Sequence, residues 1–441
     1  MKIIFLIFLI SMAQSLESSE PKKVFADYIV SNSLHSDAKT LQTEMNLAIS
    51  TGIDGFALSV TKSSLMPSLI SNLFEASLTF PDFKLYFFFD MTQINDLSIP
   101  IDYIKQYHNH PNYFHFQGKP FVSTLGGEML KFGENSTNLG WEKNFKQKLK
   151  EDNIDIFFVP SWYVFDTVEA SKYDIYSNNV FTRNPILDGG LNWAGAWSTS
   201  NDYKTNYEDE GFYKAIANSQ GKIYMAAVSP WFSQKSLRKN WIYKSEILYP
   251  KRWKEIVEIQ PDLVLIVSWN NGEDSSYIAG DFEGFDHMAW LNMTSYYISG
   301  YKNEGKYPNI IQDQVTFWYR PHSKRAFCQQ KNSIGLPTNA EWAEDKIIVH
   351  AILAFGGQVI VINGHRRKVF KGQRGINVFE LPFQEGAVEV SLWRNKRLLA
   401  RKEGVKKIEE GFIEVCNFNA HVDKLVYRMN NAGNFRKNIV M

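Results

Sequence analysis

Carboxylates and aromatic side chains gather where apolar runs of this chain end. The run "LVLIVSW" passes directly into "NNGEDSSYI", which places Glu273 and Asp274 just beyond a buried segment. An earlier run, "FKLYFFFD", ends on Asp90. Cleavage of a glycosidic bond needs two such carboxylates, because one must donate a proton while the other stays ionised. The pattern therefore points to acid–base chemistry in an aromatic-lined cleft.

Other apolar runs end on side chains suited to hold a sugar. Carboxylates and amides bind hydroxyl groups, and aromatic rings stack on flat, weakly polar faces. The alternative for the rings of Trp162, Trp231, Trp269 and Tyr277 is packing beneath the rim, and the sequence weighs the two roles equally. The candidate binding residues are Asp27, Glu128, Trp162, Trp231, Trp269, Asn271 and Tyr277. Trp193 and Trp197 are weaker candidates, because their strand is poorly defined.

Competing chemistries lack their motifs. The nine histidines form no HExxH, and His108-Asn-His110 stands beside Pro111 in a predicted loop, where a structural role is favoured over a metal-ligand pair. The sequence has no Gly-x-Ser-x-Gly elbow, phosphate loop or CxxC motif. We therefore expect no metal and no cofactor.

The composition describes an ordinary globular protein with an aromatic surplus. Of 441 residues, 44% are hydrophobic, 22% are charged and 15% are aromatic, and the formal net charge is +1. A balanced charge gives no reason to expect a nucleic-acid or anionic-membrane partner. The length allows two or three domains.

The first fifteen residues read as a secretory signal peptide. "MKIIFLIFLISMAQS" has one Lys, an apolar run too short to span a bilayer, and small residues for cleavage. The alternative is a membrane anchor, but no later segment is long and apolar enough to cross a membrane. We expect a secreted protein, extracellular or in a cell wall, with no membrane association after signal removal.

Secretion gives meaning to the cysteines and to two glycosylation sequons. Cys328 and Cys416 are predicted to form a disulfide, with two buried free thiols as the alternative. Asn135 and Asn292 each begin an Asn-x-Thr/Ser sequon.

Short apolar strands alternate with helical patterns through residues 16–312. Eight such units, each strand buried on both faces, favour a closed (β/α)8 barrel over an open doubly wound sheet. The expected strands cover residues 24–30, 55–60, 83–90, 120–127, 154–162, 189–197, 223–232 and 263–269. Because barrel active sites form at the carboxyl ends of the strands, the candidate residues share one rim.

In residues 313–441 the pattern changes to short strands in which apolar and polar residues alternate. "QVIVINGHRRKVF" contains an Asn363-Gly364 hairpin turn, and "AVEVSLW" alternates apolar and polar residues. We predict an antiparallel β-sandwich. A rigid appendage is favoured over a glycan-binding domain, because no exposed aromatic row is evident.

Several long motifs resemble glycoside hydrolase family 71, the fungal α-1,3-glucanases or mutanases. They include "AISTGIDGFALSV", "FKLYFFFDM", "YHNHPNYFHFQGKPFVST", "VSPWFSQKSLRKNW", "RWKEIVEIQPDLVLIVSWN" and "WYRPH", in family order. The resemblance implies a (β/α)8 barrel with a C-terminal β domain. It also implies inverting endo-hydrolysis of α-1,3-glucan without a metal, with Asp90 as one catalytic acid.

The chain departs from the family pattern at two places. The family motif after the last strand is close to Trp-Asn-Asp-Tyr-Gly-Glu, so the family Asp is Asn271 here. The family Glu becomes Asp274 without gaps, or Glu273 if a slip is allowed. An amide cannot act as an ordinary acid or base. Asp27 stands where the family usually has His.

We therefore expect a secreted, monomeric glycoside hydrolase of α-1,3-glucan. Asp90 and Glu273 are its predicted acid–base pair, Asp274 is the alternative to Glu273, and Asn271 has a binding role. Two rivals stay open. One is a catalytically impaired glycan-binding protein on the same fold, and the other is a hydrolase of another glucan linkage.

Overall fold

The computed structural model describes residues 20–162, 180–198, 200–203, 219, 221–235, 239–328 and 335–428. The predicted signal peptide, residues 1–15, lies outside the described residues. No helix in the described part of the chain is long and apolar enough to span a bilayer.

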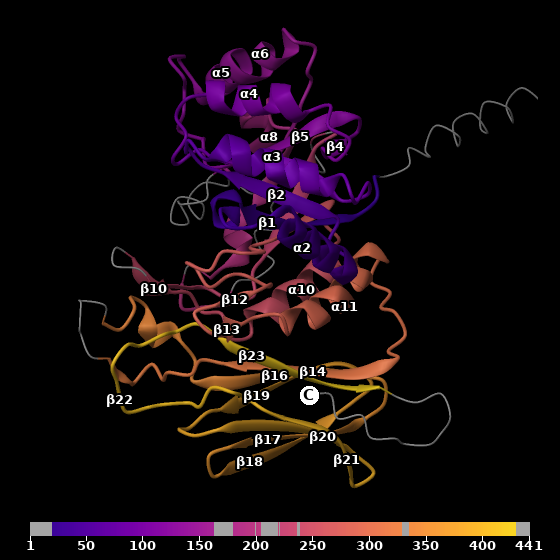
Figure 1. Cartoon of the computed structure of the whole chain (residues 1–441), viewed down its shortest axis with the longest axis vertical. Coiled ribbons are helices and arrows are strands. Elements are labelled where there is room, and N and C mark those ends of the chain that lie inside the picture. Colours follow the sequence, from indigo (N-terminus) through magenta and orange to yellow (C-terminus); the bar gives the residue numbers. More distant parts are fainter. Residues whose placement is uncertain are drawn as a thin grey trace, which may run out of the picture.

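One large sheet organises the N-terminal two thirds (Figure 1). Its order is β4-β5-β3-β2-β1-β11-β8-β7, with β6 paired to the other side of β5. All pairings are parallel except that of the short β4 (His115–Phe116) with β5. The parallel strands are β1 (Lys23–Ile29), β2 (Gly55–Val60), β3 (Lys84–Asp90), β5 (Lys119–Leu125), β6 (Phe157–Phe158), β7 (Gly189–Asn192), β8 (Ile223–Val228) and β11 (Leu263–Ile266).

The two ends of this sheet meet. Between β6 and β7, the N–H of Asp188 donates to the carbonyl of Phe158 at 2.8 Å, and that of Leu191 to the carbonyl of Pro160 at 3.1 Å. The sheet therefore curls back on its own edge. The strand predicted at 154–162 is much shorter than expected, because only two residues of β6 pair with β5.

Helices cover the outside of the curled sheet. In α2, Leu41, Met45 and Ala48 are buried at helical spacing, Asp37 caps the first turn, and Gly52 ends the helix in a left-handed conformation. The helices are α2 (Ala38–Thr51), α3 (Met66–Ser77), α4 (Ser98–Tyr107), α5 (Thr137–Trp141), α6 (Gln147–Lys150), α8 (Val180–Arg183), α10 (Leu248–Ile259) and α11 (Trp290–Lys302). Single turns occur at η1 (Val30–Ser33), η2 (Glu142–Lys146), η3 (Trp193–Ala196) and η4 (Ala340–Trp342).

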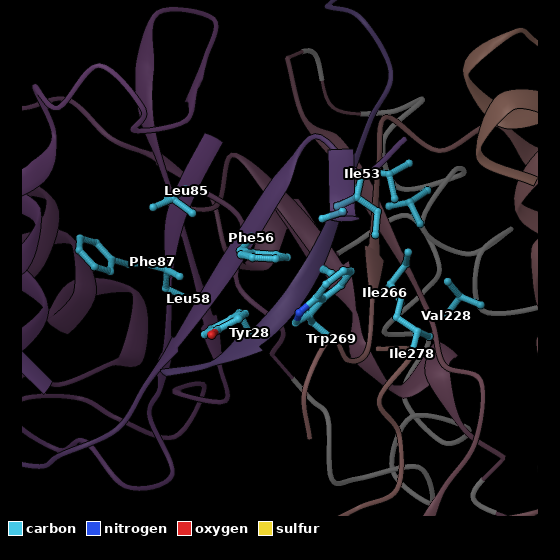
Figure 2. Packing of buried hydrophobic residues seen from close by; sticks show 14 of the residues in the cluster. Tyr28, Ile53, Phe56, Leu58, Leu85, Phe87, Val228, Ile266, Trp269 and Ile278 are labelled. Carbon is cyan, nitrogen blue, oxygen red and sulfur yellow. The ribbon is translucent and has the colours of Figure 1, made fainter. Parts of the chain in front are cut away.

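Alternation along the strands separates two hydrophobic layers. Phe25 and Phe88 belong to the cluster inside the curl, whereas Tyr28 and Phe56 belong to the cluster beneath the helices, part of which Figure 2 shows. Successive side chains of a strand point to opposite faces. The layer of any strand residue therefore follows from its position in the sequence.

The C-terminal third forms two four-stranded antiparallel sheets around a shared apolar core. The predicted Asn363-Gly364 hairpin is confirmed by the pairing of β17 with β18. The first sheet has the order β19 (Gly375–Pro382), β16 (Lys346–Leu353), β14 (Gln312–Tyr319), β23 (His421–Arg428). The second has the order β18 (Arg366–Gly372), β17 (Gly357–Asn363), β20 (Val388–Arg394), β21 (Arg397–Glu403).

Three two-stranded ladders complete the structure. They join β9 (Ser233–Lys235) with β10 (Asn240–Ile242), β12 (Asp281–Phe282) with β13 (Phe285–Asp286), and β15 (Phe327–Cys328) with β22 (Phe412–Ile413). Cys328 and Cys416, beside the last ladder, form a disulfide with 5.5 Å between their Cα atoms.

A buried junction attaches the C-terminal sheets to the curled sheet. Figure 1 shows the first C-terminal sheet next to α10 and α11. Trp318 packs on Trp290 of α11, with ring centroids 6.1 Å apart, and its indole N–H donates to the carbonyl of Glu246 at 2.8 Å. The Glu246 carboxylate accepts from Arg320 Nε at 3.2 Å. The two regions therefore share one packed interior.

Candidate active site

Three carboxylates stand at the end of the curled sheet where its parallel strands finish. Asp27 and Asp90 come two residues after Phe25 and Phe88, so they take the inward direction of those rings. Asp274 lies in the loop after β11. Its charge and that of Asp90 both act on Asp27. The structure thus brings together three of the predicted residues.

Asp27 is the most deeply buried of the three. Its side chain is 1% exposed, and one oxygen accepts a hydrogen bond from the hydroxyl of Ser59 on β2. Burial raises the pKa of Asp27 to about 7, because water no longer solvates its charge, and repulsion from Asp274 and Asp90 adds to this effect. Asp27 therefore holds a proton over much of the acidic range.

Asp90 is half-exposed and firmly oriented. Its Oδ1 accepts from the backbone N–H of Thr92 at 3.0 Å and from the Thr92 hydroxyl at 2.6 Å. Its Oδ2 accepts from Gln93 Nε2 at 2.7 Å. Three donors fix the direction of this carboxylate at the end of β3.

The loop after β11 gives its two adjacent acids, Glu273 and Asp274, different surroundings. Asp274 is half-buried, and its Oδ2 accepts from Nδ2 of Asn271 at 2.8 Å. The backbone N–H of Asp274 donates to Oδ1 of the same amide at 3.2 Å, and the N–H of Asn271 donates to Ser268 Oγ at 2.8 Å. Glu273 points into solvent and is exposed.

Burial raises the pKa of Asp274 to about 6. The hydrogen bond from Asn271 opposes this shift, whereas the charge of Glu273 adds to it. Asn271 therefore orients Asp274, and Asp274 has the environment of a proton donor near neutral pH.

Four predicted aromatic binding residues are buried and make packing contacts. Trp269 is 1% exposed and packs under the helices against Phe56, as Figure 2 shows. The indole N–H of Trp231 donates to the carbonyl of Phe418 at 3.0 Å. Both therefore support the fold.

Tyr277 and Trp162 have similar surroundings. The Tyr277 hydroxyl donates to the carbonyl of Phe285 at 2.6 Å and accepts from Asn419 at 3.1 Å. Trp162 is 7% exposed and lies against Trp141 and Phe158. The alternative of packing, left open by the sequence, describes all four rings.

Glu128 lies beside the mouth of the curled sheet. It is half-buried in the loop after β5, and its Oε2 would stand 3.7 Å from a Cβ placed on Gly126. Its backbone carbonyl accepts from the Thr137 hydroxyl at 2.8 Å. A substrate-binding role for Glu128 stays a prediction.

The partly buried side chains that pack against the interior cluster form its apolar lid. They are Leu125, Trp193, Trp241 and Tyr243. The sequence makes Trp193 only a weak candidate and does not single out Trp241 and Tyr243, because the short β10 that carries "NWI" gives no strand signal of its own. Within the described ranges, no group of three or more His, Cys, Asp or Glu side chains is arranged to hold a metal ion.

The two sequons lie in different settings. Asn135 is exposed in the loop before α5. Asn292 lies half-buried in α11, and its side-chain oxygen accepts a hydrogen bond from Lys424 of β23. Asn135 is therefore the more accessible of the two side chains.

Comparison with known proteins gives one family and several relatives. A family model described as glycosyl hydrolase family 71 matches residues 20–433. A glucan endo-1,3-alpha-glucosidase of Schizosaccharomyces pombe is 32% identical over 439 residues, covering 96% of this chain and 99% of the relative. A mutanase of Penicillium rubens is 29% identical, covering 92% and 89%.

A solved structure is also similar in part. The GH99 endo-alpha-mannosidase of Bacteroides thetaiotaomicron has a TM-score of 0.46 at 14% identity, covering 64% of this chain and 98% of that one. A third curated relative, the ascus wall endo-1,3-alpha-glucanase of Schizosaccharomyces pombe, is 28% identical over 360 residues, covering 76% and 80%.

Proposed function

Because this chain belongs to glycosyl hydrolase family 71, and is therefore a glycoside hydrolase, we propose that it cleaves the α-1,3-glucan of cell walls from within the polymer. Two relatives named as a glucan endo-1,3-alpha-glucosidase and an ascus wall endo-1,3-alpha-glucanase support this substrate. The observation that carries the proposal is the group of Asp27, Asp90 and Asp274 at one end of the sheet.

Asp274 and Asp90 divide the acid–base work. Asp274, whose pKa is raised by burial to about 6, donates a proton to the glycosidic oxygen as the bond to the anomeric carbon breaks. Asp90, oriented by three donors, accepts a proton from the water that attacks the anomeric carbon. A water held between two carboxyl groups gives inversion.

Asp274 replaces Glu273 as the preferred partner of Asp90. Glu273 is exposed, whereas Asp274 is half-buried and held by Asn271. Asn271 therefore acts by positioning the acid. Asp27 is 1% exposed and accepts a hydrogen bond from Ser59, so it supports the two acids from beneath, and its binding of a sugar hydroxyl stays a prediction.

The architecture that suits this function is a (β/α)8 barrel over residues 16–312 with a β-sandwich over residues 313–441. The eight parallel strands and the bonds between β6 and β7 support closure. The predicted signal sequence and the proposed wall substrate support an extracellular or cell-wall location. The protein acts as a monomer.

The test is release of reducing ends from insoluble α-1,3-glucan by the purified mature protein, beside the Asp90→Asn variant. An α-1,4-glucan and a β-1,3-glucan serve as substrate controls. We expect release from α-1,3-glucan alone, with the β-anomer appearing first by proton NMR. Release of reducing ends from another glucan would show that the protein cleaves that linkage instead. Binding of glucan without release would show a glycan-binding protein.

A further inference from the structure

The three aromatic rings of the apolar lid lie at the same end of the curled sheet as the carboxylates. Trp193 directly follows β7. Trp241 lies in β10, and Tyr243 directly follows it. All three are half-buried and pack against the interior cluster. A half-exposed aromatic ring beside acids is the surface on which a sugar face packs.

Trp193 covers part of the interior cluster of the curled sheet. Its ring stacks on Phe88 with centroids 5.2 Å apart and an interplanar angle of 22°. Phe88 points inside the curl two residues before Asp90, so the covered face of Trp193 is turned inward, and Trp193 lies near the end of β3 that carries Asp90. The turn that carries Trp193 is fixed by Asn192, whose Oδ1 accepts from Gly195 N at 3.0 Å.

Tyr243 lies on the Asp274 side. Burial, and next the charge of Asp274, raise the pKa of Tyr243. The hairpin that leads to this ring is tied to the acid, because the N–H of Ser233 at the start of β9 donates to the backbone carbonyl of Asp274 at 2.9 Å. The buried ring of Trp197 contacts both Trp193, at 5.6 Å, and Tyr243, at 6.3 Å.

Trp241 is less suited to stack on a sugar. Phe232 lies parallel to it at 6.4 Å and 12°, and Lys239 Nζ lies 5.4 Å from its ring centroid. Phe232 also contacts Tyr243, with ring centroids 4.6 Å apart, so the Lys239 cation over its ring is what sets Trp241 apart.

The division of work between the acids orients the bound polymer. The base faces the anomeric carbon of the sugar that is cleaved, and the acid faces the oxygen that leaves with the next sugar. We propose that Trp193 is the stacking platform of the cleaved sugar and Tyr243 that of the leaving-group sugar, so the glucan runs from β7 towards the β9–β10 hairpin. This inference rests on the proposed function.

The test compares two substrates that differ in the leaving group. One is an α-1,3-gluco-oligosaccharide, and the other is the corresponding oligosaccharyl fluoride, whose leaving group has no ring. Trp193→Leu should lower kcat/KM about 3- to 10-fold on both. Tyr243→Leu should lower it by that factor on the oligosaccharide and much less on the fluoride. Trp193→Phe, which keeps a flat ring, should recover most of the loss.

Tyr296→Leu is the matched control. Tyr296 is a half-buried ring of α11 stacked on Tyr307 at 4.8 Å, outside the cleft. The inference is overturned if Trp193→Leu and Tyr243→Leu match this control, or if Tyr243→Leu affects both substrates equally.

Calorimetric binding of the oligosaccharide separates this inference from the proposed function. If the wild-type protein hydrolyses neither substrate, the proposed function fails. The platforms then stand only if Trp193→Leu and Tyr243→Leu weaken binding while Tyr296→Leu does not. Equal urea unfolding curves for the variants exclude a loss of fold as the cause.

Discussion

Two buried carboxylates, one at the mouth of the curled sheet and one at its junction with the C-terminal sheets, are held in opposite ways. Asp27 is 1% exposed and Glu246 is 3% exposed. Burial raises the pKa of both. At Glu246 the Arg320 guanidinium opposes that shift, whereas at Asp27 two further acids add to it.

The difference distinguishes a buried ion pair that supports the fold from a group of acids suited to proton transfer. At the junction, Glu246 accepts from Arg320 and from the N–H of Glu344 at 2.8 Å, so its charge is paired. At the mouth, like charges stand close together in a poorly hydrated site, which favours proton retention. A protein tolerates such an arrangement where proton transfer is required.

Removing the cation of the junction should have the largest effect on stability. Arg320 also donates to Asp345 Oδ1 at 2.8 Å and is 1% exposed. Arg320→Ala leaves Glu246 buried without its cation, so we expect a loss of about 3–5 kcal/mol in the free energy of unfolding in urea. Lys148→Ala, which breaks the exposed pair with Glu151, is the control and should change little. Equal losses would remove the distinction between the two regions.

Neutralising Asp27 at the mouth should increase the free energy of unfolding at neutral pH, whereas removing Arg320 at the junction decreases it. The folded pKa of Asp27, about 7, is above the ordinary 3.8. The folded state therefore binds the proton more tightly than the unfolded state, and stability falls as pH rises from about 4 through 7. Asp27→Asn should remove that fall, worth at most about 4 kcal/mol at pH 8.

Urea unfolding at pH 4, 6 and 8 measures this effect. Asp202→Asn, at an exposed position, is the control and should follow the wild-type pH dependence. A wild-type stability that rises from pH 4 to pH 8 relative to Asp27→Asn would contradict the described burial of Asp27.

The smallest effect concerns glycosylation. In a eukaryotic secretion host, Asn135 should carry a glycan and Asn292 should not, because Asn292 is half-buried at the junction and bonded to Lys424. Mass spectrometry of Asn135→Gln and Asn292→Gln distinguishes the two sites. A glycan on Asn292 would show that this position is modified before the junction folds, and would contradict the expectation.

The sequence predicted the frame of the site well. Runs of buried strand residues located the eight parallel strands, and the carboxyl ends of these strands carry Asp27 and Asp90. Period-two alternation is a local property, so the inward direction of both acids is readable from Phe25 and Phe88.

The sequence could not show which aromatic rings are used in packing, or which of the two loop acids is held within the site. Trp231 and Tyr277 bond to Phe418 and Asn419, partners more than 140 residues away along the chain that only the folded junction reveals. The choice between Glu273 and Asp274 depends on a turn closed by the Asn271 side chain, and neighbouring residues in a turn face different ways.

The most direct test of the account is hydrolysis of α-1,3-glucan by Asp274→Asn and Glu273→Gln, two neighbouring substitutions that each remove one charge. Asp274→Asn should lose about 10²–10⁴-fold in rate, as expected for loss of a proton donor. Glu273→Gln should keep nearly wild-type activity. The reverse result, with Glu273→Gln inactive and Asp274→Asn active, would contradict the assignment of the acid.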